Sequence, residues 1–205
     1  MNVTAAPAST APLPPPDRGP IAQALQDADQ RVYTALASPL GAGTDRWVGR
    51  FTTLADHSKI SMLTAAGLAV FGGVRGRRAA VTGMVAVAAT SATANAVVKP
   101  IAHRRRPLRH PKHPSGQPGQ SHHVTMPTSR SFPSGHTAAA CAFAVAAGSV
   151  WPAVGVASGA VAVAVGYSRV HVGVHYPGDV AAGALLGAGI GAVAGHYLPP
   201  RLPLR

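Results

Sequence analysis

The chain has 205 residues, a formal net charge of +12 and 47% hydrophobic content, but only 12% charged residues. This balance is atypical of an ordinary soluble domain, and the excess of positive charge favours an anionic partner. With 5% aromatic residues and a single cysteine inside an apolar run, the composition argues against nucleic-acid binding, a disulfide framework and a thiolate metal site.

The first 54 residues are expected to lie outside the part of the chain that crosses a membrane. Residues 1–20, rich in Pro, Ala, Ser and Thr, are predicted to form a disordered tail that lacks the features of a secretory signal. Residues 21–54 are assigned to an amphipathic interfacial helix and a linker, because apolar residues recur at roughly helical spacing among polar ones. These apolar residues are Ile21, Leu25, Val32 and Leu36.

Four apolar runs follow in residues 55–198, the expected membrane-embedded domain. Runs 60–74 and 79–98 are both predicted to cross the membrane. A helix over the second run measures about 30 Å, which is enough to cross a bilayer. Run 137–167 is too long for one pass, and Trp151-Pro152 in its middle predicts two passes joined by a turn. The last run, 180–198, precedes a C-terminal tail at 199–205.

These runs predict an all-α, polytopic membrane helix bundle with about five transmembrane helices plus the N-terminal amphipathic helix. If the Trp151-Pro152 turn divides two passes, loops 99–136 and 168–179 lie on the same side of the membrane. Glycines occupy every fourth position on one face of the last run, at Gly183, Gly187, Gly191 and Gly195. Such a stripe allows close helix packing, either within the bundle or between the subunits of a homo-oligomer.

Three polar clusters lie at the ends of these runs. They are Lys99 to Arg106-Pro107, Pro133-Ser134-Gly135-His136, and Ser168-Arg169 to His175 and Asp179. Each cluster alone has an ordinary explanation. A basic loop can set topology or bind headgroups, Ser-Gly can begin a helix, and Asp179 can cap the run that follows it.

Asp179 is the only acidic residue within 57–205, although that stretch contains most of the Lys and Arg. It follows His175 by four positions, so its carboxylate could fix the imidazole tautomer and support a positive charge on the ring. The cap and the His-Asp pair are compatible roles for the same side chain.

Taken together, the clusters read Lys-x6-Arg-Pro, Pro-Ser-Gly-His and Ser-Arg-x5-His-x3-Asp, in that order. This pattern resembles the three-part signature of the type 2 phosphatidic acid phosphatase superfamily, which also includes vanadium-dependent haloperoxidases and bacterial acid phosphatases. The resemblance covers residues 99–179 and leaves residues 1–50 without a counterpart. It implies a phosphatase in a bacterial cell membrane that uses no metal and no cofactor.

By this resemblance, His175 is the nucleophile that forms a phosphohistidine, and His136 protonates the leaving oxygen. Asp179 orients the His175 imidazole and supports a positive charge on it. The implied phosphate-binding residues are Lys99, Arg106, Ser134, Gly135 and Arg169. Cationic side chains and N–H groups at a helix start are the donors that a phosphoryl group needs as its charge develops. The chain has no Glu and few Asp, which argues against a two-metal site, and no second carboxylate is expected near the phosphate.

The expected substrate is a lipid phosphate, either a polyprenyl phosphate or diphosphate or a phosphatidate, with membrane lipids around the protein and the site on the extracytoplasmic face. Two alternatives stay open: a vanadate-dependent haloperoxidase, and a non-catalytic membrane protein that binds lipid headgroups. Arg104 and Arg105 are interpreted as a solvated charge run, with binding of a headgroup or a second phosphate as the alternative. His171 is expected to be non-catalytic, and residues 110–131 are interpreted as a lid or substrate-access loop.

Overall fold

The computed structural model of the protein describes residues 19–38, 40–102, 104–107, 124 and 126–198. Within these residues the chain is helical and contains no strand. The elements are α1 (Pro20–Leu36), α2 (Ala42–Leu54), η1 (Asp56–Ser58), α3 (Lys59–Phe71), α4 (Gly73–Ala92), the π-helical η2 (Thr93–Val98), α5 (Lys99–Ile101), α6 (Gly135–Val150), α7 (Pro152–His171) and α8 (Pro177–Tyr197). The all-α prediction is confirmed.

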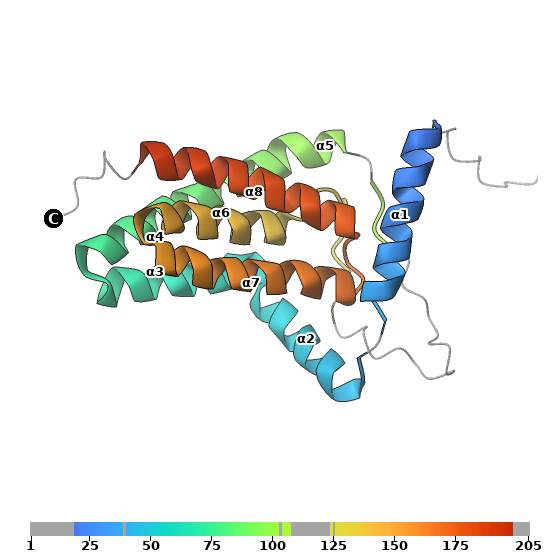
Figure 1. Ribbon diagram of the computed structural model, residues 1–205, viewed down its shortest axis with the longest axis horizontal. Helices are drawn as coiled ribbons and strands as arrows, with labels where there is room; N and C mark the ends of the chain where they lie inside the picture. The colour runs from blue at the N-terminus through green and yellow to red at the C-terminus, as the bar shows by residue number, and fades with distance from the viewer. Residues whose placement is uncertain (1–18, 39, 103, 108–123, 125, 199–205) are drawn as a thin grey trace, which may run out of the picture.

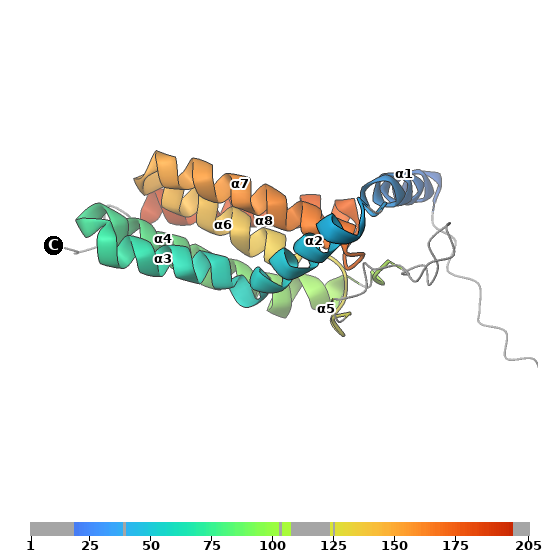
Figure 2. The same ribbon diagram turned by 90° about the horizontal axis from the view of Figure 1, so that it is seen from below.

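Helix α6 is the centre of the bundle and packs against α4, α7 and α8, while α3 packs against α4. These helices run along the long axis of the molecule (Figure 1). Helix α1 lies across one end of the bundle, where it contacts α7 and α8, and α2 extends from the same region (Figure 2). The N-terminal helices therefore cover the end at which α6 and α8 begin.

The predicted turn at Trp151-Pro152 is confirmed. Trp151 has an extended backbone that ends α6, and Pro152 begins α7, where its fixed φ and missing N–H are tolerated. Helix α7 returns antiparallel to α6 (Figure 1), so the loop before α6 and the loop after α7 meet at one end of the bundle.

The helices match the predicted membrane runs to different degrees. Among the described residues, three helical segments are long and apolar enough to cross a membrane: Gly73–Ile101, Pro152–His171 and Pro177–Tyr197. Helices α3 and α6 are apolar but shorter. Large apolar side chains face outward on the bundle, as at Phe71, Val156 and Leu185, which are 88%, 77% and 76% exposed. Such an exterior suits lipid rather than water, and the chain is an integral membrane protein.

The glycine stripe of α8 packs on α6 within the same subunit. A Cβ at Gly183 would lie 2.5 Å from the Ser134 carbonyl oxygen, and one at Gly191 would lie 2.7 Å from that of Ala142. A Cβ at Gly187 would overlap the Ala138 carbonyl. The stripe therefore serves packing within the bundle, and an association of subunits would have to use another surface.

The N-terminal helix α1 is confirmed as a helix and rests on the protein. Tyr33 is buried and its ring centroid lies 5.5 Å from that of Tyr176, whereas Ile21 and Leu25 are exposed. A second helix, α2, follows in the segment assigned from the sequence to a helix and a linker. The single turn η1 then places Asp56 next to the start of α6.

Candidate active site

The three polar clusters converge at one end of the bundle. Lys99 begins the short helix α5, and Ser134 to His136 stand at the start of α6. Arg169 lies in the last turn of α7, and His175 lies in the connection to α8. These residues lie at helix ends or in the connection between two helices, because each cluster lies where an apolar run stops. The structure thus brings all eight predicted site residues to the same region.

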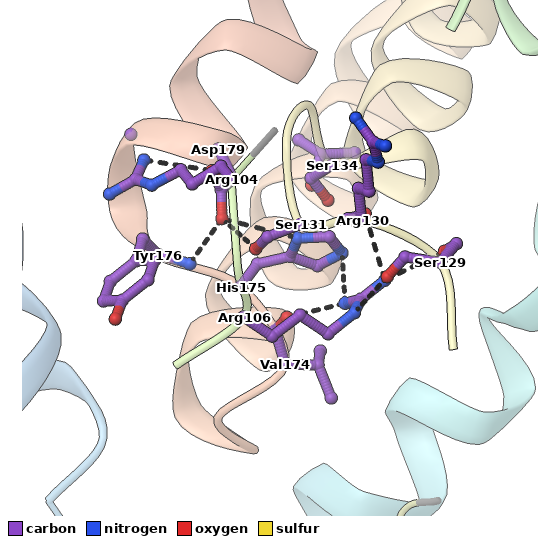
Figure 3. Close-up of polar contacts among 12 residues, drawn as sticks. Arg104, Arg106, Ser129, Arg130, Ser131, Ser134, Val174, His175, Tyr176 and Asp179 are labelled. Carbon is purple, nitrogen blue, oxygen red and sulfur yellow. Dashed lines mark hydrogen bonds and ion pairs between the residues drawn. The ribbon is translucent and has the colours of Figure 1, made fainter. Parts of the chain in front are cut away.

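Asp179 is fully buried in the first turn of α8 and faces His175. Its Oδ2 accepts hydrogen bonds from Ser131 Oγ at 2.5 Å and from the Tyr176 N–H at 2.9 Å, and it lies 3.7 Å from His175 Nδ1. The bond from Tyr176 caps α8, which begins at Pro177, earlier than the predicted run. Asp179 therefore caps the helix and faces the imidazole at the same time (Figure 3).

The other ring nitrogen of His175 faces a cation. Arg106 Nη1 lies 3.3 Å from His175 Nε2, and the guanidinium is held by the carbonyl oxygens of Val174 at 2.6 Å and Ser129 at 2.9 Å. Because a guanidinium only donates, Nε2 must accept, and the ring proton belongs on Nδ1, toward Asp179. Figure 3 shows the ring between Arg106 and Asp179.

The surroundings of His175 favour its neutral form. Burial is the main cause that lowers the pKa of the His175 imidazole below its ordinary value. Asp179 raises this pKa, while Arg106 and Arg169 lower it. A neutral ring with its Nε2 lone pair directed toward a cationic pocket has the properties of a nucleophile.

Lys99 and the start of α6 form the second wall of the site. A Cβ added at Gly135 would lie 3.8 Å from Lys99 Nζ, which donates to Asn95 Oδ1 at 2.8 Å. Ser134 is the N-cap of α6, and its Oγ lies 3.0 Å from Thr137 Oγ1. The N–H groups of a first helical turn have no partner within the helix, so this end of α6 suits an anion.

Arg169 and His136 share a carboxylate that sequence analysis did not place here. Asp56 Oδ1 accepts from Arg169 Nη2 at 2.9 Å and lies 3.2 Å from His136 Nε2. Arg169 Nη2 also donates to the Thr52 carbonyl at 2.8 Å, and its buried Nε has no hydrogen-bond partner among the described residues. The expectation that no second carboxylate lies near the phosphate is wrong. The single turn between α2 and α3 brings Asp56 next to two of the predicted site residues.

The interpretation of Arg104 as part of a solvated charge run is also wrong. Arg104 Nη1 donates to Asp179 Oδ1 at 3.0 Å, and Nη2 pairs with Asp29 of α1. The guanidinium carbon lies 4.4 Å from the centroid of the Tyr176 ring. Its neighbour Arg105 is exposed, as expected for a solvated charge. Arg104 therefore connects α1 to the carboxylate that faces His175.

Comparison with known proteins decides the family. The sequence profile of the PAP2 superfamily matches residues 80–202, more than half of the chain. The chain belongs to the PAP2 superfamily. The matched range includes all three polar clusters, whereas Asp29, Asp45 and Asp56 precede it.

Curated relatives cover part of this PAP2 chain. Decaprenylphosphoryl-5-phosphoribose phosphatases from two strains of Mycobacterium tuberculosis are 38% identical over 101 residues, which is 47% of this chain and 49% of each relative. The chain thus spans about half the length of the curated relatives it matches.

Two solved structures share the fold over most of the chain. The transmembrane PAP2-type phosphatidylglycerolphosphate phosphatase from Bacillus subtilis is 24% identical, with a TM-score of 0.65 over 89% of this chain and 90% of that one. Aquifex aeolicus LpxE is 22% identical, with a TM-score of 0.63 over 82% of this chain and 94% of that one. These likenesses confirm the arrangement of helices as that of PAP2 membrane proteins.

A second histidine of the third PAP2 cluster has a different environment. His171 is buried, with Nε2 2.9 Å from Asp45 Oδ1 and Nδ1 3.1 Å from the Leu36 carbonyl oxygen. These partners belong to α2 and to the end of α1, so His171 joins α7 to the N-terminal helices. Of the loop 110–131 that was interpreted as a lid, residues 110–123 and 125 lie outside the described residues.

A pocket of about 130 Å³ runs from the PAP2 site between α3, α6 and α7. It begins at His136 and is bordered by Ala55, which precedes η1, and by Ser58, the last residue of η1. Its remaining lining is mostly apolar or hydroxyl-bearing: Ile60, Ser61, Thr64, Ala140, Phe143, Ala157, Ser158, Val161 and Val165. A group attached to a phosphate beside His136 would therefore have space on this side.

Proposed function

We propose that this PAP2 protein is a membrane lipid phosphatase that transfers a phosphoryl group first to His175 and then to water. The observation that carries the proposal is the placement of His175 itself. Its Nε2 lies 3.3 Å from Arg106 Nη1, and its Nδ1 lies 3.7 Å from Asp179 Oδ2. This arrangement suits a nucleophile held in one tautomer, with its attacking nitrogen directed toward a bound anion.

In the first step, the Nε2 lone pair of His175 attacks phosphorus and the bond between phosphorus and the lipid oxygen breaks. The electron pair of that bond goes to the leaving oxygen, which takes a proton from His136. In the second step, water attacks the phosphohistidine and gives a proton to His136, and inorganic phosphate leaves. His175 returns to its neutral form, and Asp179 supports the positive charge that the ring carries in between.

Binding of the phosphoryl oxygens is assigned to the cations and to the start of α6. Lys99, Arg106 and Arg169 supply charge, while Ser134 and the Gly135 N–H supply further donors. These groups stabilise the charge that develops on phosphorus oxygens during transfer, which is the role that a metal ion has in other phosphatases. We therefore expect full activity in the presence of a chelator.

For the substrate we propose a lipid phosphate of the polyprenyl or phosphatidate type. The similar proteins include decaprenylphosphoryl-5-phosphoribose phosphatases and a phosphatidylglycerolphosphate phosphatase, and the outward apolar side chains would place the site at the edge of a bilayer. A lipid tail can then stay in the membrane while its phosphate reaches Arg106 and His175.

The site is proposed to face the extracytoplasmic side of a bacterial cell membrane. Its basic residues are accounted for by phosphate binding, whereas Arg75 and Arg77 at the opposite end agree with a cytoplasmic location. The test is labelling of Gln30→Cys on α1 by an impermeant thiol reagent in intact cells, in a Cys141→Ala background. Labelling of Arg77→Cys instead of Gln30→Cys would reverse the orientation.

The activity is tested with purified protein and a panel of polyprenyl phosphates, phosphatidate and phosphatidylglycerol phosphate. We expect phosphate release from at least one lipid, loss of release in His175→Ala, and inhibition by vanadate. Full release by His175→Ala would reject the mechanism. Lipid binding without turnover across the panel would favour a headgroup-binding protein, and bromide oxidation by vanadate-loaded protein would favour a haloperoxidase.

A further inference from the structure

The carboxylate of Asp56 lies beside the residue proposed to protonate the leaving oxygen. Its Oδ1 is 3.2 Å from His136 Nε2, and its side chain is 28% exposed, so it borders open space rather than the bundle interior. As the proton donor, His136 must be in its imidazolium form, which carries a proton on both ring nitrogens, and its Nε2 proton is the one that faces the carboxylate of Asp56.

This geometry determines where the leaving group must pass. To receive the Nε2 proton, the leaving oxygen has to approach within hydrogen-bond distance of Nε2 and therefore comes next to Asp56 Oδ1. The pocket on this side also begins at His136 and is bordered by Ala55 and Ser58. The group behind the leaving oxygen would thus enter this pocket past His136, next to the carboxylate of Asp56.

The charge of the leaving group then matters. A phosphomonoester releases an alcohol, which is uncharged after it takes the proton and can donate its O–H to Asp56. A diphosphate releases a phosphorylated lipid instead, which places at least one additional negative charge at the same position. The negative charge of Asp56 would repel a phosphorylated leaving group at this distance, and such repulsion is a common source of specificity.

We infer that Asp56 selects phosphomonoesters with an uncharged leaving group and rejects lipid diphosphates. The inference rests on the proposed function, because it takes His136 as the proton donor. Arg169 Nη2, 2.9 Å from the same oxygen, neutralises part of the carboxylate charge and moderates the effect. Asp56 is a positioning residue for His136 and Arg169 as well as a determinant of specificity.

A purely structural role for Asp56 makes a different prediction. If Asp56 served only to hold Arg169 and His136, its removal would weaken phosphate binding and proton transfer for every substrate to the same degree. The ratio of activities on a monophosphate and a diphosphate with the same prenyl tail separates the two roles. This ratio is also independent of the fraction of a variant that folds.

The experiment compares kcat/KM for farnesyl monophosphate and farnesyl diphosphate in wild-type protein, Asp56→Asn and Asp27→Asn. Asp27 is exposed on α1, so its variant has the same change in net charge away from the site. We expect the wild type to favour the monophosphate by about tenfold or more, since like charges a few ångströms apart at a protein surface repel each other. Asp56→Asn should shift this ratio toward the diphosphate, and Asp27→Asn should not.

A wild-type preference for the diphosphate, or equal losses on both substrates in Asp56→Asn, would overturn the inference. His175→Ala is measured alongside as the test of the proposed function. If His175→Ala keeps phosphate release, the proposed function fails, while the ratio measured for Asp56→Asn still decides whether Asp56 sets the preference.

Discussion

Arg104 donates to Asp179 Oδ1 at 3.0 Å, while the other oxygen of the same carboxylate lies 3.7 Å from His175 Nδ1. We expect Arg104→Ala to lower kcat by about 10–100-fold, the cost of losing a hydrogen bond to a charged group. The matched control is Arg105→Ala, which removes an exposed cation from the next position. Similar kinetics in both variants would show that Arg104 does not position Asp179.

The fall of kcat/KM at low pH, the acidic limb of the pH–rate profile, is expected to report the protonation of His175. Since burial lowers the pKa of this imidazole, the neutral nucleophile should persist below the ordinary histidine value of 6.5. Arg106→Gln removes a cation that lowers this pKa, so the limb should move to higher pH. Asp179→Asn removes a group that raises it, so the limb should move to lower pH.

Opposite displacements in these two variants are the diagnostic result, because both also lose activity. The measurement is kcat/KM from pH 4 to 8, together with NMR titration of ring-labelled histidine. Displacements in the same direction would assign the limb to a group other than His175.

His171 is expected to contribute to stability and not to catalysis, although it lies in the same cluster as His175. Replacing it by Ala leaves the buried Asp45 carboxylate without its partner at 2.9 Å, at a cost of about 1–3 kcal/mol. We expect a lower Tm in detergent with kcat within a few-fold of the wild type. A loss of kcat as large as that of His175→Ala, in folded protein, would contradict this assignment.

The contact between α6 and α8 is expected to tolerate no side chain at Gly187. A Cβ there would overlap the Ala138 carbonyl, so Gly187→Ala should cost about 1–3 kcal/mol through overpacking. Gly189 in the same helix has nothing within 4 Å of an added Cβ, and Gly189→Ala is the control. Thermal unfolding of both variants in the same detergent makes the comparison, and equal Tm values would exclude this packing.

Much of the membrane bundle could be predicted from the sequence, because apolar runs and breaks are local features. Trp151-Pro152 predicted the division between α6 and α7, and this division correctly predicted that the two site loops share one end. The spacing of the clusters likewise identified residues that the structure brings together. Helix α2 was missed, although Val48, Phe51 and Leu54 recur in it at helical spacing.

The acidic partners of the site could not be predicted in the same way. Asp29, Asp45 and Asp56 contact Arg104, His171 and Arg169, each more than 70 positions further along the chain. No local pattern specifies such pairs, since they depend on how α1 and α2 lie across the end of the bundle. The sequence contained one hint, namely that all the Asp residues except Asp179 precede the basic part of the chain.

The transfer of phosphate to His175 is tested most directly by trapping the phosphoenzyme. Protein mixed with a 32P-labelled lipid phosphate is quenched in alkali within one turnover, digested and analysed by mass spectrometry. We expect one phosphoryl group per site, on the peptide that contains His175 and on its Nε2, and none in His175→Ala. Label on another residue, or release of phosphate at the full single-turnover rate without any labelled protein, would contradict the mechanism.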